Sequence, residues 1–170
     1  MNAPHDLHAT IDALADFPER LERLFYCFPP ELRRWAPPSW DGVPSEKLNA
    51  IEQICHVRDV EIEGYRIRFE RTRLESSPVL PDLPGEEMAQ ERRYSAQDPL
   101  AALRDFARAR AVNVEAIRHF TEDQLKRTAI FEGKVTTLMG LVHFLGSHDY
   151  QHLSGLQWLL AKSEQTGRVP

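Results

Sequence analysis

The sequence predicts an all-α protein, an antiparallel four-helix bundle folded as a single domain over residues 1–170. Three observations favour this fold. Apolar residues recur every three or four positions in four long segments. The alternation of apolar and polar residues that is typical of strands occurs only in short stretches. The sequence contains no internal repeat. A chain of this length can also bury a core without disulfides or structural metals.

The first two predicted helices flank a proline-rich connection. The first covers residues 7–28, and Pro18 is expected to kink or split it because proline cannot donate a backbone hydrogen bond. The second covers residues 45–74, with Ser45 as its N-cap. Between them, residues 31–44 carry two tryptophans that are expected to pin the connection to the core.

A longer connection, residues 75–97, follows the second helix and is predicted to lack regular structure. It contains several prolines and one glycine and shows no sustained apolar period. Long structureless connections are uncommon in compact domains and are often lids or binding loops. The sequence leaves open whether this one is a lid or a flexible insertion.

The second half of the chain supplies the remaining elements. A third helix is predicted for residues 98–120, opened by Asp98 as N-cap and a proline in the first turn. Residues 121–124 match a capping box and predict a short helical turn. Residues 129–135 predict a turn or a small hairpin, and the fourth helix covers residues 136–162.

Composition narrows the classes of partner. With 21 Lys and Arg against 26 Asp and Glu, the net charge of -5 offers no electrostatic attraction to nucleic acid or to an anionic membrane. The sequence shows neither a signal peptide nor a membrane span, so a cytoplasmic protein acting on a small molecule is expected. Cys27 and Cys55 are expected to be buried thiols, as in a reducing compartment. Trp158 is either a homodimer contact or a core residue.

The fourth predicted helix contains an apolar stripe that two histidines interrupt. The stripe consists of Leu141, Leu145, His148, His152, Leu156 and Leu159. An imidazole at a buried position needs a hydrogen-bond partner or a metal ion. His148 and His152 are one helical turn apart, so both can reach one cation. On its own, the pair is better explained by two hydrogen-bonded core or boundary histidines, because histidines at this spacing often occur by chance.

A metal site needs at least one more protein ligand. The other histidines are His5, His8, His56, His119 and His143. The two nearest the N-terminus are expected to be solvated, and His119 is expected to lie at a helix C-terminus, where the helix dipole favours a cation. His143 is about 140° from His148 around the helix and points away from it.

His56 lies in the second predicted helix, on a polar seam with Glu52, Asp59 and Glu63. This seam is about 120° from the middle of the helix's apolar stripe, which favours a solvated charged face. A boundary position that leans into a cleft is the alternative.

Three segments of the chain resemble the DinB-like (damage-inducible) superfamily, which includes the YfiT-type metal-dependent hydrolases. They are QICHVRDVE around His56, LAALRDFARAR in the third predicted helix, and TTLMGLVHFLGSHDYQHLSGLQWLL with its HDxxxH-like motif. The resemblance extends from Trp40 to Leu160. It implies a divalent metal bound at one end of a four-helix bundle by His56, His148 and His152.

The resemblance implies more than one chemistry, because the family includes thiol transferases as well as hydrolases. The favoured hypothesis is a metalloenzyme that activates a low-molecular-weight thiol for transfer. The alternatives are a hydrolase that uses metal-bound water and a non-enzymatic bundle that a metal stabilises. Zn or Ni is the expected metal, with Fe and Cu as further candidates for histidine ligands.

Supporting carboxylates are expected around the ligands. Asp59, Glu63 and Asp149 are candidates for accepting hydrogen bonds that orient the imidazoles. Glu63 is also the candidate general base for hydrolysis. No glutamate adjoins the histidine pair of the fourth helix in the sequence, which counts against hydrolysis.

Three residues are candidates for binding the substrate. Arg108 or Arg110 could hold a carboxylate of a thiol through paired hydrogen bonds, and Tyr94 lies in the long connection. An exposed helix face is the alternative explanation for the two arginines.

Overall fold

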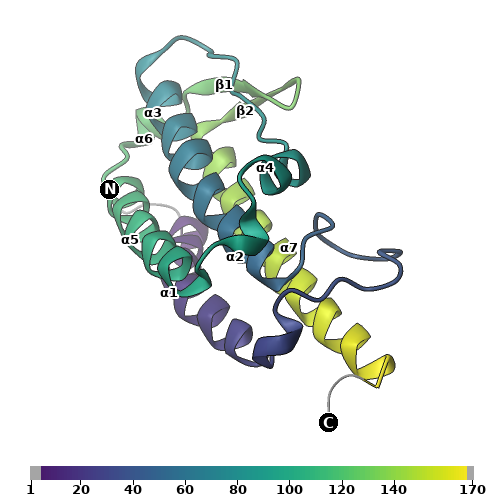
Figure 1. Cartoon of the computed structure of the whole chain (residues 1–170). Helices are drawn as coiled ribbons and strands as arrows, with labels where there is room; N and C mark the ends of the chain where they lie inside the picture. Colours follow the sequence, from purple (N-terminus) through teal and green to yellow (C-terminus); the bar gives the residue numbers. More distant parts are fainter. Residues whose placement is uncertain (1–4, 168–170) are drawn as a thin grey trace.

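The long helices of the computed structural model, which describes residues 5–167, form a four-helix bundle (Figure 1). They are α1 (His5–Tyr26), α2 (Ala50–Asp59) continued by α3 (Arg66–Leu74), α5 (Pro99–Arg118) and α7 (Leu138–Gln165). Helices α1 and α2 each pack mainly on α5 and α7, so α1 and α2 are diagonal to one another. The predicted fold class is confirmed.

Helix α1 continues through Pro18 as one helix, so the predicted split is wrong, whereas the predicted kink stays a prediction. Proline lacks the N–H that would bond to the carbonyl of Leu14, four residues earlier. In the folded chain Arg110 of α5 donates to that carbonyl, with 3.1 Å between Nη1 and the oxygen. The tertiary structure thus satisfies the acceptor that proline leaves without an intrahelical partner.

The second long helix begins at Ala50 and not at Ser45 as predicted. Asn49 is its N-cap, and the Asn49 side chain and Glu52 form a reciprocal capping box. After α2, the π-helical turn Val60–Tyr65 leads into α3 without a break, and the helix ends at the predicted residue.

The connection of residues 75–97 is ordered, so the prediction of an irregular loop is wrong. It contains the short helix α4 (Gly85–Glu91) and the 3₁₀ turn Tyr94–Ala96. Met88 and Tyr94 are buried in the core against α2 and α5, and this burial stabilises the segment against α2.

A small hairpin and a short helix precede α7. Helix α6 (Glu122–Leu125) has the predicted capping box, and β1 (Thr128–Phe131) pairs antiparallel with β2 (Lys134–Thr137). Thr128 is opposite Thr137. Glu132 and Gly133 form the turn, with φ of 51° and 73°, values that suit a two-residue hairpin loop.

Both tryptophans of the first connection are fixed on the core, as predicted. Trp40 stacks on Trp158 of α7, with ring centroids 6.0 Å apart and planes 14° apart. Trp35 is partly buried against the same core. Of the two cysteines, Cys55 is buried as predicted, but Cys27 is exposed just after α1, between the buried side chains of Phe25 and Phe28.

The core consists of two hydrophobic clusters with a buried polar layer between them. Along α5, Phe106 belongs to one cluster and Val114 to the other, and the buried Arg110 lies between them. Along α7, Leu145 and Leu153 are in different clusters. The two histidines of α7 lie in this interval, so they occupy the middle of the bundle. The resemblance had implied a position at one end, and this expectation is corrected.

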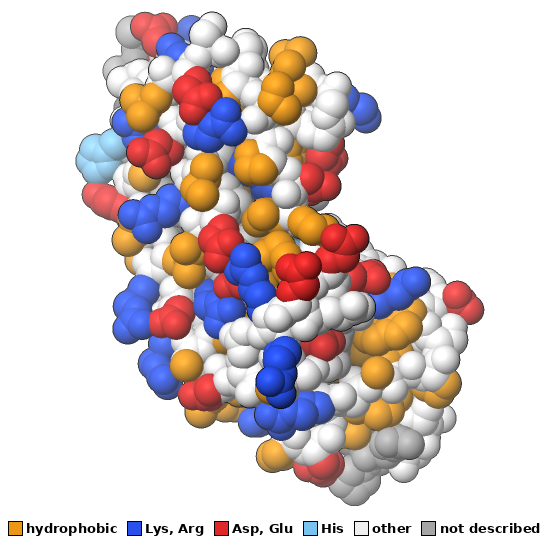
Figure 2. All heavy atoms as spheres, turned by 45° about the horizontal axis from the view of Figure 1, so that its top comes forward, with side chains coloured by type: hydrophobic (Ala, Val, Ile, Leu, Met, Phe, Trp, Pro, Cys, Tyr) orange, Lys and Arg blue, Asp and Glu red, His pale blue; other side chains and the backbone are white. Residues whose placement is uncertain are grey.

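The described surface mixes the two signs of charge. Figure 2 shows acidic and basic side chains interspersed over one face, with hydrophobic side chains between them. Within residues 5–167, no helix is long and apolar enough to cross a membrane.

Candidate metal centre

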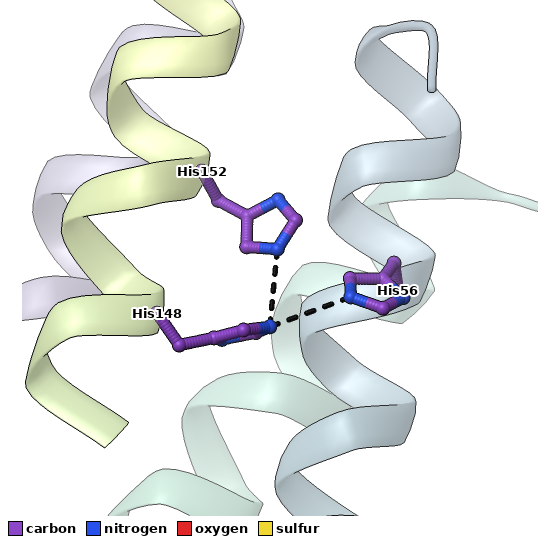
Figure 3. A group of neighbouring side chains, drawn as sticks. All are labelled: His56, His148 and His152. Atoms are coloured by element: carbon purple, nitrogen blue, oxygen red, sulfur yellow. Dashed lines mark hydrogen bonds between the residues drawn. The ribbon is translucent and has the colours of Figure 1, made fainter. Parts of the chain in front are cut away.

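Three imidazoles converge between α2 and α7. His56 projects from α2 toward His148 and His152 of α7 (Figure 3). The Nε2 atom of His148 is 3.4 Å from Nε2 of His56 and 3.1 Å from Nε2 of His152. Two ligands of one tetrahedral zinc ion are about 3.3 Å apart. The separations therefore fit a shared cation.

All three imidazoles are held in the neutral form that binds a metal. His56 is 1% exposed and His152 is fully buried. Burial lowers the pKa of His56 and lowers the pKa values of His148 and His152 well below the usual range. The pKa of His148 is lowered further by His56 and by Arg110 and Arg68, and that of His152 by His148 and His56.

His56 is buried because α2 is covered on the side that the sequence pattern suggested was solvated. Helix α4 packs there, and Gly85 lies directly against the His56 ring. A Cβ at Gly85 would be 2.6 Å from Cε1 and 2.9 Å from Nδ1 of His56, which is too close. Glycine at this position lets α4 cover the imidazole.

Glu46 completes the polar surface of the site, and the sequence analysis missed it. Its Oε1 is 3.5 Å from Nε2 of His56, and its Oε2 is 3.5 Å from Nε2 of His152. The Oε2 atom is buried and has no hydrogen-bond partner within the described part of the chain. A buried carboxylate oxygen without a donor is costly unless a cation or proton is near it. The donor set thus fits a divalent metal ion.

A hydrogen-bond relay orients His152. Its Nδ1 donates to Oε1 of Gln53 on α2, and Nε2 of Gln53 donates to Oγ of Ser45 at 2.8 Å. Because Nδ1 carries the proton, the lone pair of His152 is on Nε2, which faces the other imidazoles. Gln53 was not predicted as a site residue. Its position, three residues before His56, is the only signal in the sequence.

A pocket of about 240 Å³ opens beside the histidines. Its wall includes Glu46, His56, Tyr65, Arg68, Phe131 and His148. The α2–α3 helix, the hairpin and α7 therefore all contribute to it. The pocket is large enough for a small molecule and too small for a folded partner.

Comparison with protein families decides the relationship that the motifs indicated. The family model of the DinB superfamily matches residues 13–155. The chain belongs to the DinB superfamily. A similar solved structure is YfiT from Bacillus subtilis, described as "a probable metal-dependent hydrolase with an unusual four-helix bundle topology". The TM-score is 0.80 at 16% identity, covering 98% of this chain and 91% of that chain. Comparison with curated proteins gave no match.

Two of the predicted supporting carboxylates in this DinB-superfamily chain bind arginines. Asp59 accepts hydrogen bonds from Arg58, Arg92 and Tyr94 at 2.7, 2.7 and 2.6 Å. Glu63 accepts two from Arg92, at 2.7 and 2.8 Å. Within residues 7–167 neither carboxylate accepts a hydrogen bond from an imidazole, because the ordered connection of residues 75–97 supplies these other donors. Tyr94 itself is fully buried and does not reach the pocket.

Asp149 and the two arginines of α5 are also outside the pocket. Asp149 is buried and bonds to Arg110 at 2.6 and 2.8 Å. Arg110 also bonds to Glu61 at 2.8 Å, so its two Nη atoms bind two carboxylates inside the bundle. Arg108 is exposed and pairs with Asp105. Among residues 7–167 Asp149 accepts no hydrogen bond from an imidazole, and neither arginine lines the pocket beside the histidines.

The remaining histidines are away from the centre. His8, His119 and His143 are exposed, and the side chain of His5 is outside the described part of the chain.

Replacing Gly155 with alanine is expected to weaken metal binding about 10- to 100-fold, the usual effect of disturbing the hydrogen bonds behind a metal ligand. A Cβ there would be 2.2 Å from Oγ of Ser45 and 2.7 Å from Nε2 of Gln53, so the relay to His152 must shift. Zinc affinity measured by competition with a chromogenic chelator tests this.

The matched control is Gly146→Ala on the same helix, where the nearest atom to a Cβ is 4.0 Å away. This variant should retain the wild-type affinity. Equal zinc affinity in both variants would show that the relay does not support His152.

Proposed function

We propose that this DinB-superfamily protein is a metal-dependent hydrolase of small esters or amides. His56, His148 and His152 would hold the ion through their Nε2 atoms, and Glu46 would act as the proton acceptor. One observation carries the choice of hydrolysis: Oε2 of Glu46 is buried, has no hydrogen-bond partner among residues 7–167, and faces Nε2 of His152 at 3.5 Å. The description of YfiT as a probable metal-dependent hydrolase supports it.

When bound, a divalent ion at such a site supplies a Lewis acid that acidifies water and polarises a carbonyl group. The residues of the chain perform the other tasks. Gln53 keeps the proton of His152 on Nδ1 and so keeps Nε2 directed at the centre. A carboxylate oxygen of Glu46 accepts a proton from the attacking water and returns it to the leaving group. The rings of Tyr65 and Phe131 supply apolar surface for the rest of a small substrate.

Zinc and nickel are the metals that we favour. Three imidazoles with an open position are a common catalytic zinc arrangement, and imidazole is also a good ligand for nickel. Thiol activation is the less favoured reaction, because Arg108 and Arg110, the residues expected to hold the thiol, are not in the pocket. Glu46 has a role as proton acceptor in hydrolysis, whereas it has no evident role in thiol transfer.

Two further expectations stay predictions. One is a cytoplasmic location. The other is a homodimer, for which Trp158 is no longer a good contact because it stacks on Trp40 of the same chain. Any dimer would use another surface.

The variant Glu46→Gln tests the proposed reaction. Removing the proton acceptor should lower kcat by about 10²- to 10⁴-fold on any ester or amide that the wild type hydrolyses, with metal content unchanged. Glutamine keeps the size of the side chain and removes its charge. Turnover of a nitrophenyl ester and anilide panel by zinc-loaded protein, with elemental analysis of each variant, gives the measurement.

The control is Glu132→Gln, an exposed glutamate at the mouth of the same pocket. It should retain wild-type kcat. Hydrolysis that is unchanged in Glu46→Gln would refute the assigned role, and loss of the metal from that variant would identify Glu46 as a ligand.

A further inference from the structure

Arg68 of α3 is a buried cation that lines the pocket and has no carboxylate partner. It is 3% exposed. Its Nε and Nη2 donate to the carbonyl oxygen of Pro81, at 3.3 and 3.1 Å. Among residues 7–167, no Asp or Glu oxygen is within 4.0 Å of its guanidinium nitrogens.

Arg110, the other arginine that is almost fully buried in the bundle, shows what such a charge usually requires. It is 1% exposed and bonds to the carboxylates of Glu61 and Asp149. A buried charge without a paired counter-ion is costly. The carboxylates that act on Arg68, those of Asp82 and Glu132, do so from beyond 4.0 Å, so this second arginine needs an explanation. Arg68 receives partial compensation from two aromatic faces, with its guanidinium carbon 4.9 Å from the Tyr65 ring centre and 4.5 Å from that of Phe131.

Arg68 and the metal centre share one pocket. Arg68 and His148 both line it, and the ring of Tyr65, which lines it too, is close to both of them. The Tyr65 ring centre is 6.0 Å from that of His148 and 4.9 Å from the guanidinium carbon of Arg68. A molecule the length of a short acyl chain can therefore touch the guanidinium with one end and the histidines with the other.

We propose that Arg68 binds a carboxylate of the substrate, which makes the substrate class short esters or amides with a carboxylate at the end remote from the scissile carbonyl. The reaction in this statement rests on the proposed function, whereas the anion site does not. A planar guanidinium matches a carboxylate through paired hydrogen bonds. Asp82 and Glu132, both exposed at the mouth, repel a second negative charge and so favour a carboxylate over a phosphate dianion.

Binding of hydroxamates to zinc-loaded protein tests the proposal without any turnover. Glutaric acid monohydroxamate carries a terminal carboxylate, and butyric hydroxamic acid lacks it. By calorimetry, the wild type should bind the carboxylate probe about tenfold more tightly, the value of one charge-assisted contact. Succinic and adipic monohydroxamates vary the spacing, and one length should be best.

In Arg68→Met, which keeps the apolar stem and removes the charge, this preference should disappear, while Arg68→Lys should keep part of it. Glu132→Gln should keep or increase it. Helical circular dichroism establishes that each variant is folded, and Arg68→Lys carries the test if methionine is not tolerated.

Three results would overturn the proposal: no carboxylate preference in the wild type, the same preference in Arg68→Met, or tighter binding of a phosphonate-ended probe than of the carboxylate. Failure of the proposed function looks different. In that case the hydroxamates bind with the expected pattern, but no ester or amide is hydrolysed.

Discussion

Replacing His56 with alanine is expected to leave the protein without its metal and without hydrolytic activity. His56 is the one imidazole of the centre that α2 supplies, and its removal leaves two histidines, both on α7. Two imidazoles are fewer than the three protein ligands that catalytic zinc sites use. Elemental analysis of purified protein should find metal in the wild type and almost none in the variant.

Thermal stability gives a second measurement of the same loss. A ligand at 1,000 times its Kd stabilises the folded state by about 4 kcal/mol, so a chelator should lower the Tm of the wild type. The Tm of His56→Ala should not respond. The control is His143→Ala, an exposed histidine on α7 that should keep both the metal and the chelator response. Full metal retention in His56→Ala would contradict the three-histidine centre.

Replacing Arg110 with leucine is expected to destabilise the fold by about 3–5 kcal/mol. The guanidinium bonds to Glu61, to Asp149 and to the carbonyl of Leu14, and each would lose this donor in the interior, although Asn113 still donates to the other oxygen of Glu61. Urea unfolding followed by circular dichroism measures the change in free energy. The exposed Arg108→Leu on the same helix should change it by less than about 0.5 kcal/mol.

The role of Arg110 in α1 can be separated from its role in the ion pairs. Adding Pro18→Ala to the Arg110→Leu variant restores an N–H four residues after Leu14, so the helix can satisfy that carbonyl itself. The double variant should recover about 1 kcal/mol, the net value of one hydrogen bond. No recovery would show that Arg110 does not compensate for Pro18.

Short-range signals in the sequence predicted the elements well, and long-range contacts explain the errors. Asp98 and Thr121 cap their helices as predicted, because a cap depends only on residues within one turn. Pro18 did not interrupt α1, because the compensating donor comes from another helix. At the start of α2, the N-cap is Asn49 and not the predicted Ser45, because only Asn49 has a glutamate three residues later to complete a capping box.

The same distinction between short-range signals and long-range contacts applies to the candidate site. The spacing of His148 and His152 predicts a shared cation, and His56 was added by resemblance to a family. Glu46 could not be predicted, because it belongs to an irregular segment whose path depends on the packing of α2 against α7. The role of Gln53 could not be predicted for a similar reason, because its partner His152 is on a different helix.

The π-helical turn Val60–Tyr65 determines which residues of this helix share a side with His56. His56, Val60, Tyr65 and Arg68 all line the pocket, although the steps between them are four, five and three residues. In a regular α-helix a step of five residues would rotate a side chain about 140° away. The wider turn absorbs this step and keeps Arg68 in phase with His56. The turn thus accommodates one extra residue. Deleting one residue within it would leave a step of eleven residues from His56 to Arg68, which in a regular α-helix is only about 20° out of phase, so both side chains should still face the pocket.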